Sequence, residues 1–329
     1  MGKTASMGDL FGGDAAGGWL NLPCVGSERL ADVDIGVIGI GSATPYPVGS
    51  YCHDAPDAIR DARSWPTILD HHDFDLFDVD PSDGVIPPGV TAADLGNLDV
   101  VADAAPEVAA TNRQLIRESI TGMLDAGTRP FVLGGDDSVP IPVLESYCGF
   151  AGGPISILQI DAHIDWRAEV GGETQGLSSN MRRASEMAHV GSIVQLAARG
   201  IGSARKAEVE AALDYGVAFH TMRRLREPGG IKRAVADLPE GVPVYVALDV
   251  DSLDPTLMPA VIGAAQGGLD YWQMMEIFEA VAARAPICGF NMVEFMPSRD
   301  VNEQGALMAS RLGLSMLGMM AQQIASRDA

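Results

Sequence analysis

The feature that most constrains the fold is a short apolar run that ends in a group of charged residues. Residues 155–160 read Ile-Ser-Ile-Leu-Gln-Ile, and Asp161-Ala-His-Ile-Asp165 follows directly. The run is typical of a buried strand, and open α/β sheets place their chemistry at the carboxyl ends of such strands. A plain polar loop explains one acid, but in an extended backbone Asp161, His163 and Asp165 all point to one side. Like charges so close need a positive charge among them, which predicts a bound divalent cation.

Two further apolar runs end in the same way. Residues 242–248 lead into Asp249-Val-Asp251, where the acids again alternate, and residues 129–133 open into Gly134-Gly-Asp-Asp-Ser138. Three strand ends that each deliver carboxylates are enough to surround a pair of metal ions that share bridging carboxylates. The spacing therefore predicts a metal site with more than one ion.

Composition excludes several classes of partner. The net charge of −22 argues against binding to nucleic acid or to an anionic membrane, and it favours a small cationic substrate. The four cysteines are far apart and form no Cys-x-x-Cys pair, so neither a zinc knuckle nor a redox motif is indicated. The sequence shows no secretory leader and no apolar run long enough for a membrane span. We expect a cytoplasmic protein.

Strand and helix patterns alternate along most of the chain. Residues 1–33 are rich in Gly, Ala and Asp and are expected to form an irregular arm, while residues 34–329 form a single domain. Alternation over about 290 residues predicts a mostly parallel sheet with helices on both faces. We expect strands at residues 35–40, 74–79, 98–101, 130–133, 155–160, 193–198, 217–220, 242–248 and 287–295. We expect helices from residue 55 and at residues 105–126, 140–147, 180–188, 203–214, 229–236, 270–284 and 302–324.

Three acidic motifs carry a family resemblance. Gly134-Gly-Asp-Asp-Ser138, Asp161-Ala-His-Ile-Asp165 and Ala247-Leu-Asp-Val-Asp-Ser-Leu-Asp-Pro255 resemble, in order and spacing, the signatures of the ureohydrolases, which include arginases and agmatinases. The resemblance covers roughly residues 34–324. It implies a three-layer α/β/α fold with a doubly wound, mostly parallel central sheet of about eight strands. It also implies two divalent ions, Mn²⁺ or Ni²⁺, and a trimer or hexamer.

The resemblance also implies a reaction and its residues. Ureohydrolases cleave a guanidine-type C–N bond with metal-activated water and release urea and an amine. The candidate substrates are agmatine, guanidine, a guanidino acid or a biguanide such as metformin. The implied metal ligands are Asp161 and Asp249, which bridge both ions, with Asp165, His163 and Asp251 completing them. Glu294 matches the acid that pairs with the planar guanidinium. Trp166 either shapes the mouth of the substrate site or packs in the interior.

Two positions depart from the family pattern. Asp137 stands where the first signature normally carries a metal-binding histidine. Either Asp137 ligates a metal and adds a negative charge, or it no longer reaches one. Leu177 stands where family members commonly carry a histidine that passes a proton to the leaving amine. Loss of a general acid slows a reaction by about 10²-fold or more, and His189 is the nearest candidate replacement.

The departures leave alternative functions open. The loops at residues 47–56 and 262–266, which line the substrate mouth in the family, differ as well. The chain is therefore a hydrolase with an unusual substrate, a catalytically weak subunit that completes a hetero-oligomer with an active paralogue, or a guanidinium-binding protein. Metformin hydrolases pair two related chains in the second way. The retained acids favour retained metal binding.

Overall fold

In the part of the chain that the structure describes, eight parallel strands form one continuous sheet. The computed structural model describes residues 18–47, 49–62 and 85–328. The strands are β1 (Ile35–Ile40), β2 (Ala92–Asn97), β3 (Arg129–Gly134), β4 (Ile155–Ile160), β5 (Val190–Leu196), β6 (Ala218–His220), β7 (Val244–Asp249) and β8 (Ile287–Val293). Their order across the sheet is β2-β1-β3-β8-β7-β4-β5-β6. The expected doubly wound, three-layer α/β/α architecture is confirmed.

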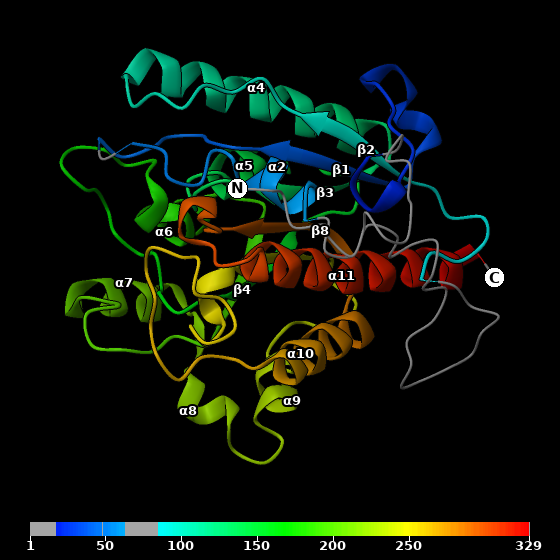
Figure 1. Ribbon diagram of the computed structural model, residues 1–329. Helices are drawn as coiled ribbons and strands as arrows, with labels where there is room; N and C mark the ends of the chain where they lie inside the picture. The colour runs from blue at the N-terminus through cyan, green and yellow to red at the C-terminus, as the bar shows by residue number, and fades with distance from the viewer. Residues whose placement is uncertain (1–17, 48, 63–84, 329) are drawn as a thin grey trace.

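Helices cover both faces of this sheet (Figure 1). They are α2 (Ala55–Arg60), α4 (Pro106–Asp125), α5 (Pro140–Glu145), α6 (Asn180–Ala184), α7 (Lys206–Tyr215), α8 (Met222–Leu225), α9 (Gly230–Val235), α10 (Tyr271–Arg284) and α11 (Gln304–Asp328). Buried side chains of α2, α9, α10 and α11 share one hydrophobic cluster, and those of α4, α5, α6 and α7 share another. None of the helices in the described part of the chain has the apolar length needed to cross a lipid bilayer.

Local sequence explains where these elements start and stop. Strands β1, β4, β7 and β8 are buried along their whole length, as near-continuous apolar runs in a parallel sheet should be. Helix α10 starts at a capping box in which Asp270 accepts a hydrogen bond from the Gln273 backbone N–H at 2.9 Å. Helix α7 ends at Tyr215 and is capped by Gly216, whose φ of 100° suits a residue without a Cβ.

The order of the strands brings the acidic segments together. Strands β3, β8, β7 and β4 are consecutive neighbours, although they are far apart in the chain. Ile160 is in register with Leu248, and Asp249 with Val293. Asp161 and Glu294, the next residues of their strands, therefore emerge at the same edge as Asp249. Parallel strands place all their carboxyl ends at one edge, so four separate segments deliver charge to one location.

Some expected elements are wrong. Residues 98–101 do not form a strand, and the strand in this part of the described chain is instead β2 at residues 92–97. Its signal was hidden because it contains Asp94, a charged residue that is buried by specific pairing. Helix α6 ends at Ala184 and not at residue 188, strand β5 begins at Val190 and not at residue 193, and helix α8 was not expected. The expected strand at residues 74–79 lies outside the described residues.

The segment before β1 packs against the sheet domain. Short 3₁₀ helices form at Trp19–Asn21 and Ser27–Asp32. Trp19 and Leu22 are buried in the main hydrophobic cluster, and the Trp19 indole N–H donates to the Ser310 hydroxyl at 3.1 Å. The division into an arm of residues 1–33 and a domain from residue 34 stays a prediction.

Asp94 joins this segment to the sheet. Its carboxylate accepts bonds from Arg60 Nε and Nη2, both at 2.9 Å, and from the Trp19 backbone N–H at 2.7 Å. Asp94→Ala leaves the guanidinium without its buried partner, so we expect a loss of about 3 kcal/mol in the free energy of unfolding. Urea titration followed by circular dichroism measures it. The control Asp32→Ala removes an exposed pair with Arg29 and should cost less than about 1 kcal/mol. Equal losses in both variants would contradict the assignment.

Candidate metal centre

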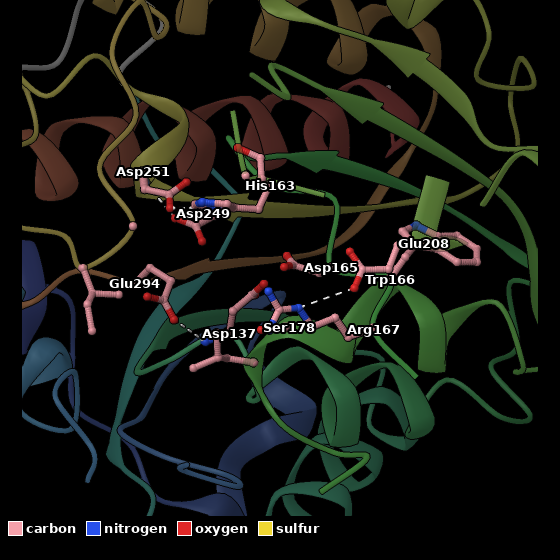
Figure 2. Close-up of a pocket in the computed structure, with 15 residues that line it drawn as sticks. Asp137, His163, Asp165, Trp166, Arg167, Ser178, Glu208, Asp249, Asp251 and Glu294 are labelled. Carbon is pink, nitrogen blue, oxygen red and sulfur yellow. Dashed lines mark hydrogen bonds and ion pairs between the residues drawn. The ribbon is translucent and has the colours of Figure 1, made fainter. Parts of the chain in front are cut away.

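A cavity of about 230 Å³ opens at the carboxyl edge of the four central strands. Figure 2 shows the carboxylates of Asp137, Asp249, Asp251 and Glu294 converging on it together with the imidazole of His163. Asp137 follows β3, His163 follows β4, Asp249 ends β7 and Glu294 follows β8. The cavity is also lined by Asp165, Trp166, Arg167, Leu177, Ser178, Gly202, Ser203, Glu208, Ile262 and Gly263.

One group of candidate ligands combines a histidine with two aspartates. Ligand atoms of Asp161, His163 and Asp251 all lie within 4.8 Å of one another. His163 Nδ1 is 3.0 Å from Asp251 Oδ2 and 3.5 Å from Asp161 Oδ1. Two carboxylates and one imidazole are a donor set that divalent transition metals accept.

A second group consists of carboxylates alone. Oxygens of Asp137, Asp161 and Asp249 also lie within 4.8 Å of one another. Asp161 belongs to both groups, whereas Asp249, the other expected bridging ligand, belongs to this group alone, and both bridging assignments stay predictions. Asp137 reaches the cluster, so of the two alternatives for the position that replaces the family histidine, the structure supports the one in which the side chain is available to a metal.

Asp165 lies beside the second group but outside both sets. Its carboxylate lines the cavity and accepts a hydrogen bond from Gln159 Nε2 at 3.0 Å. Its backbone is in the left-handed region with φ of 50°, and that of Glu294 is there too with φ of 68°. Such conformations cost non-glycine residues of the order of 1–3 kcal/mol and cluster at functional sites. The assignment of Asp165 as a metal ligand stays a prediction.

Burial of so many acids changes their protonation. Burial and the nearby carboxylates Asp165 and Asp161 raise the pKa of Asp137 well above its usual range. Burial, followed by Asp251 and Asp161, does the same to the pKa of Asp249. Burial opposes the charged form of His163, but hydrogen bonds to Asp161 and Asp251 outweigh it and raise the pKa of His163 to about 11. Additional positive charge in the site would therefore stabilise the ionised forms of these carboxylates.

Lysine and arginine side chains of the described residues do not supply this positive charge. Among the described residues, no lysine or arginine forms an ion pair with the carboxylates of either group, and His163 is their one ionic partner. Buried charges are stable only when they are paired or bound to metals. Carboxylate oxygens with one imidazole nitrogen suit Mn²⁺ and Ni²⁺. The residues present therefore fit two divalent cations.

A buried amide network supports the ligands from beneath. Gln159 Nε2 donates to Asp161 Oδ2 at 2.7 Å in addition to Asp165, and its own Oε1 accepts from Gln195. Gln195 Oε1 accepts in turn from the Trp166 indole N–H at 2.8 Å. These bonds fix each amide in one orientation, so that Gln159 Nε2 faces two candidate ligands, Asp161 and Asp165. Sequence analysis missed both glutamines, although a polar residue inside each apolar strand run was a visible signal.

Asp137 has a partner of its own. Asn180, at the start of α6, is buried and donates a hydrogen bond from Nδ2 to Asp137 Oδ2. The Asn180 side-chain oxygen has no partner among the described residues. The amide holds the carboxylate that replaces the family histidine, and no motif in the sequence pointed to it.

Glu294 is held from two sides. Its Oε1 accepts from the Asp137 backbone N–H at 2.9 Å, and the Tyr51 hydroxyl lies 2.9 Å from Oε2 and 3.0 Å from Oε1. Burial, with Asp136 as the next contribution, raises the pKa of Glu294 well above its usual range. Tyr51 comes from the loop that departs from the family pattern, so this change reaches the site directly.

The loop at residues 262–266 is positioned by one arginine. Arg199 donates from Nη2 to the backbone oxygens of Asp251 at 2.8 Å and Ala265 at 2.7 Å. This contact ties the third acidic motif to the loop that lines the cavity. A Cβ on Gly263 would lie 2.6 Å from His163 Cε1 and 2.7 Å from Asp251 Oδ2, so glycine is required for this close approach.

Three other expectations concern residues near the cavity. Leu177 lines it, as expected for the position of the family's proton-transferring histidine. His189 is absent from the lining, and its Nε2 lies 2.8 Å from the backbone oxygen of Leu144, so it does not replace that histidine. Trp166 is almost fully buried and packs on Tyr215 with ring centroids 5.9 Å apart, while part of it contacts the cavity. Its role in substrate binding stays a prediction.

Comparison with known proteins identifies the family of this chain. The profile of the Arginase family matches residues 33–318. The chain belongs to the arginase family. The mitochondrial arginase of Medicago truncatula is 35% identical over 201 residues, which cover 60% of this chain and 58% of that protein. The N(1)-aminopropylagmatine ureohydrolase of Thermus thermophilus is 31% identical over 220 residues, 66% of this chain and 71% of that protein.

Solved structures of low identity show the same fold. The proclavaminate amidino hydrolase from Streptomyces clavuligerus superposes with a TM-score of 0.78 at 20% identity, covering 93% of this chain and 97% of that one. The arginase from Medicago truncatula gives a TM-score of 0.70 at 24% identity, with 89% and 93% covered. The arginase-family sheet is thus shared over nearly the whole chain.

The metal-free protein should lose stability as pH rises. The pKa values of Asp249 and His163 are raised by folding, so the folded chain holds protons that the unfolded chain releases above about pH 4 for a carboxyl and about pH 6.5 for a histidine. After chelation we expect a lower melting temperature at about pH 8 than at about pH 5.5. Mn²⁺ should restore stability at the higher pH. Asp249→Asn should flatten the pH dependence of the metal-free form, and an unchanged slope would contradict this origin.

Gln159→Leu should weaken metal binding without unfolding the protein. It removes the donor shared by Asp161 and Asp165, and loss of such supporting contacts typically costs about 10- to 100-fold in metal affinity. Calorimetric titration with Mn²⁺ measures the change. The control Gln114→Leu removes a bond to exposed Glu118 and should leave affinity unaltered. Equal affinity in both variants would show that the network does not act on the metal.

Proposed function

We propose that this arginase-family chain is a metal-dependent hydrolase that cleaves a guanidine-type C–N bond and releases urea and an amine. The observation that carries the proposal is the convergence of buried carboxylates from the ends of β3, β4 and β7, none of them paired with a lysine or arginine among the described residues, on one cavity that Glu294 at the end of β8 also lines. Relatives named arginase and N(1)-aminopropylagmatine ureohydrolase support the reaction class. The matched part spans little more than half the length of the plant arginases.

The proposed metal ligands are Asp137, Asp161, His163, Asp165, Asp249 and Asp251. Bound there, two Mn²⁺ or Ni²⁺ ions would supply Lewis acidity and lower the pKa of a water molecule. The ligand arrangement itself is prepared by the protein. Gln159 and Asn180 fix the carboxylates that they contact, and His163 is held between Asp161 and Asp251.

Glu294 is the proposed partner of the guanidinium. A carboxylate matches the planar, forked cation in shape and charge. The Asp137 backbone N–H and the Tyr51 hydroxyl hold Glu294 in one orientation, and the phenol must share or yield its place on Oε2 when a cation binds. This makes Tyr51 a residue that tunes how tightly Glu294 takes the substrate.

The described residues of the cavity offer no evident general acid to protonate the leaving amine. Leu177 has no proton to give, and among the described residues that line the cavity His163 is the one imidazole. His163 is already engaged by two carboxylates. The described lining of the cavity therefore lacks the free imidazole that the family pattern would supply as a proton donor, which makes a slow hydrolase the expected outcome.

The same two departures support one alternative. Asp137 in place of an imidazole adds negative charge to the site, and Leu177 removes a donor. Both changes suit a catalytically weak subunit that binds metal and completes a hetero-oligomer with an active paralogue, for which a two-chain metformin hydrolase is a precedent. A homo-oligomer, trimeric or hexameric, is the corresponding proposal for the active form.

Metal content and urea release from the chain alone separate these possibilities. We expect about two divalent ions per chain and measurable urea from at least one of guanidine, agmatine, 4-guanidinobutyrate and metformin. Glu294→Gln should keep the metal but lower kcat/KM by roughly 10²-fold, because it removes the charged partner of the guanidinium. The control Glu118→Gln alters an exposed side chain and should change neither value.

The alternative predicts a different pattern. A weak subunit would bind metal but release urea only when it is mixed with the paralogue. A chain that takes up no divalent ion under any loading condition would contradict both forms of the proposal. Inductively coupled plasma mass spectrometry gives the metal content, and a coupled urease assay gives the urea.

A further inference from the structure

One arginine lines the cavity among its carboxylates. Among the described residues that line it, Arg167 is the only lysine or arginine. It follows Asp165 and Trp166 directly, and Figure 2 shows its side chain extending into the pocket with an ion pair to Glu208. Arg167 forms no ion pair with the described buried carboxylates of the metal centre, so its positive charge remains available within the cavity beside Glu208.

The guanidinium of Arg167 is only partly engaged. Its Nε lies 3.5 Å from Glu208 Oε1, and its terminal nitrogens have no hydrogen-bond partner among the described residues. A guanidinium offers a side edge that includes Nε and an end edge formed by the two terminal nitrogens. Glu208 meets the side edge, so the end edge is free to take a bidentate anion. About a third of the side chain is exposed, so a ligand can reach it.

The surroundings hold Arg167 in this position. Its backbone N–H donates to the Ser178 backbone oxygen at 3.0 Å, and the preceding Trp166 is fixed by Gln195. Glu208 is itself anchored at the start of α7, where its Oε2 accepts from the Arg205 backbone N–H at 2.7 Å. A guanidinium that is ordered before binding loses less entropy when a ligand arrives.

We propose that Arg167 binds the carboxylate of the substrate, and that the site therefore takes guanidino acids in preference to agmatine; this rests on the hydrolase function proposed above. Such molecules carry a guanidinium for Glu294 at one end and a carboxylate for Arg167 at the other. A carboxylate that entered an acidic cavity without this arginine would be repelled. An amine at the same end, as in agmatine, would meet a like charge.

Binding measured on the metal-loaded chain tests the proposal without relying on turnover. The probes are 4-guanidinobutyrate, its neutral amide 4-guanidinobutyramide, and agmatine, each titrated calorimetrically. In the unaltered chain the acid should bind about 10- to 100-fold more tightly than its amide, because only the acid forms the charged bidentate pair. This comparison needs no substitution, so it stands even if a variant fails to fold.

Variants of Arg167 test whether this side chain causes the preference for the acid. Arg167→Gln should bring the affinity for the acid down to that for the amide and leave agmatine bound equally well or better. Arg167→Lys should recover part of the preference, because it keeps the charge but not the fork. The matched control is Arg205→Gln, because Arg205 lies 4.0 Å from the same Glu208 oxygen and does not line the cavity. It should change none of the affinities.

The outcomes separate this inference from the hydrolase proposal. Equal binding of acid and amide, or equal weakening of acid and agmatine by Arg167→Gln, would overturn the role of Arg167 while leaving urea release from agmatine untouched. A preference for the acid that Arg167→Gln abolishes, in a chain that releases no urea from any probe, would support Arg167 and contradict the hydrolase function. Failure of all three probes to bind the metal-loaded chain would overturn the role of Arg167.

Discussion

Electrostatic repulsion among buried carboxylates is the constraint on which this structure depends. The sheet order places the ends of β3, β8, β7 and β4 side by side, and each end carries an acid. In water these groups would separate, but the register of a parallel sheet does not let them. The pKa values of Asp137, Asp249 and Glu294 are all raised, which shows that the folded chain alone does not stabilise their charges. Divalent cations are the simplest agents that remove this cost.

The surrounding structure gives up stability to keep this arrangement. Asp165 and Glu294 adopt left-handed backbone conformations, and Gly263 leaves room where any side chain would strike His163. Arg199 donates hydrogen bonds to backbone oxygens and not to carboxylates, so it fixes the loop without occupying the place of a metal. Supporting groups around the acids are neutral amides and a phenol. Neutral donors can orient a carboxylate and still leave its charge for an ion.

The sequence predicted most of the fold because the strands carry their signal locally. Apolar runs located β1, β4 and β7, and alternating acids after β4 and β7 located the candidate ligands. Strand β2 was missed because Asp94 makes sense inside a strand only once Arg60 and Trp19 are known to surround it.

Some residues of the site were not predicted from the sequence for the same reason. Tyr51 reaches Glu294 across 243 positions, and Asn180 reaches Asp137 across 43. Such contacts are set by how strands and loops are ordered in space, which periodicity along the chain does not contain. Arg167 was visible next to a motif, but its orientation into the cavity and its free edge are properties of the folded chain.

Charge balance connects the two unusual positions in the site. With Asp137 in place of an imidazole, the candidate ligands and Glu294 carry one more negative charge than the family pattern would give. That charge strengthens the hold on a divalent ion but reduces the ion's ability to acidify water. The carboxylate of a guanidino acid would be repelled by such a centre unless a positive group in the cavity paired with it. Arg167 provides that group outside the ligand cluster, where it neither competes with a metal nor pairs with its ligands. A more acidic centre and an arginine in the lining of the same cavity are therefore consistent features of one site.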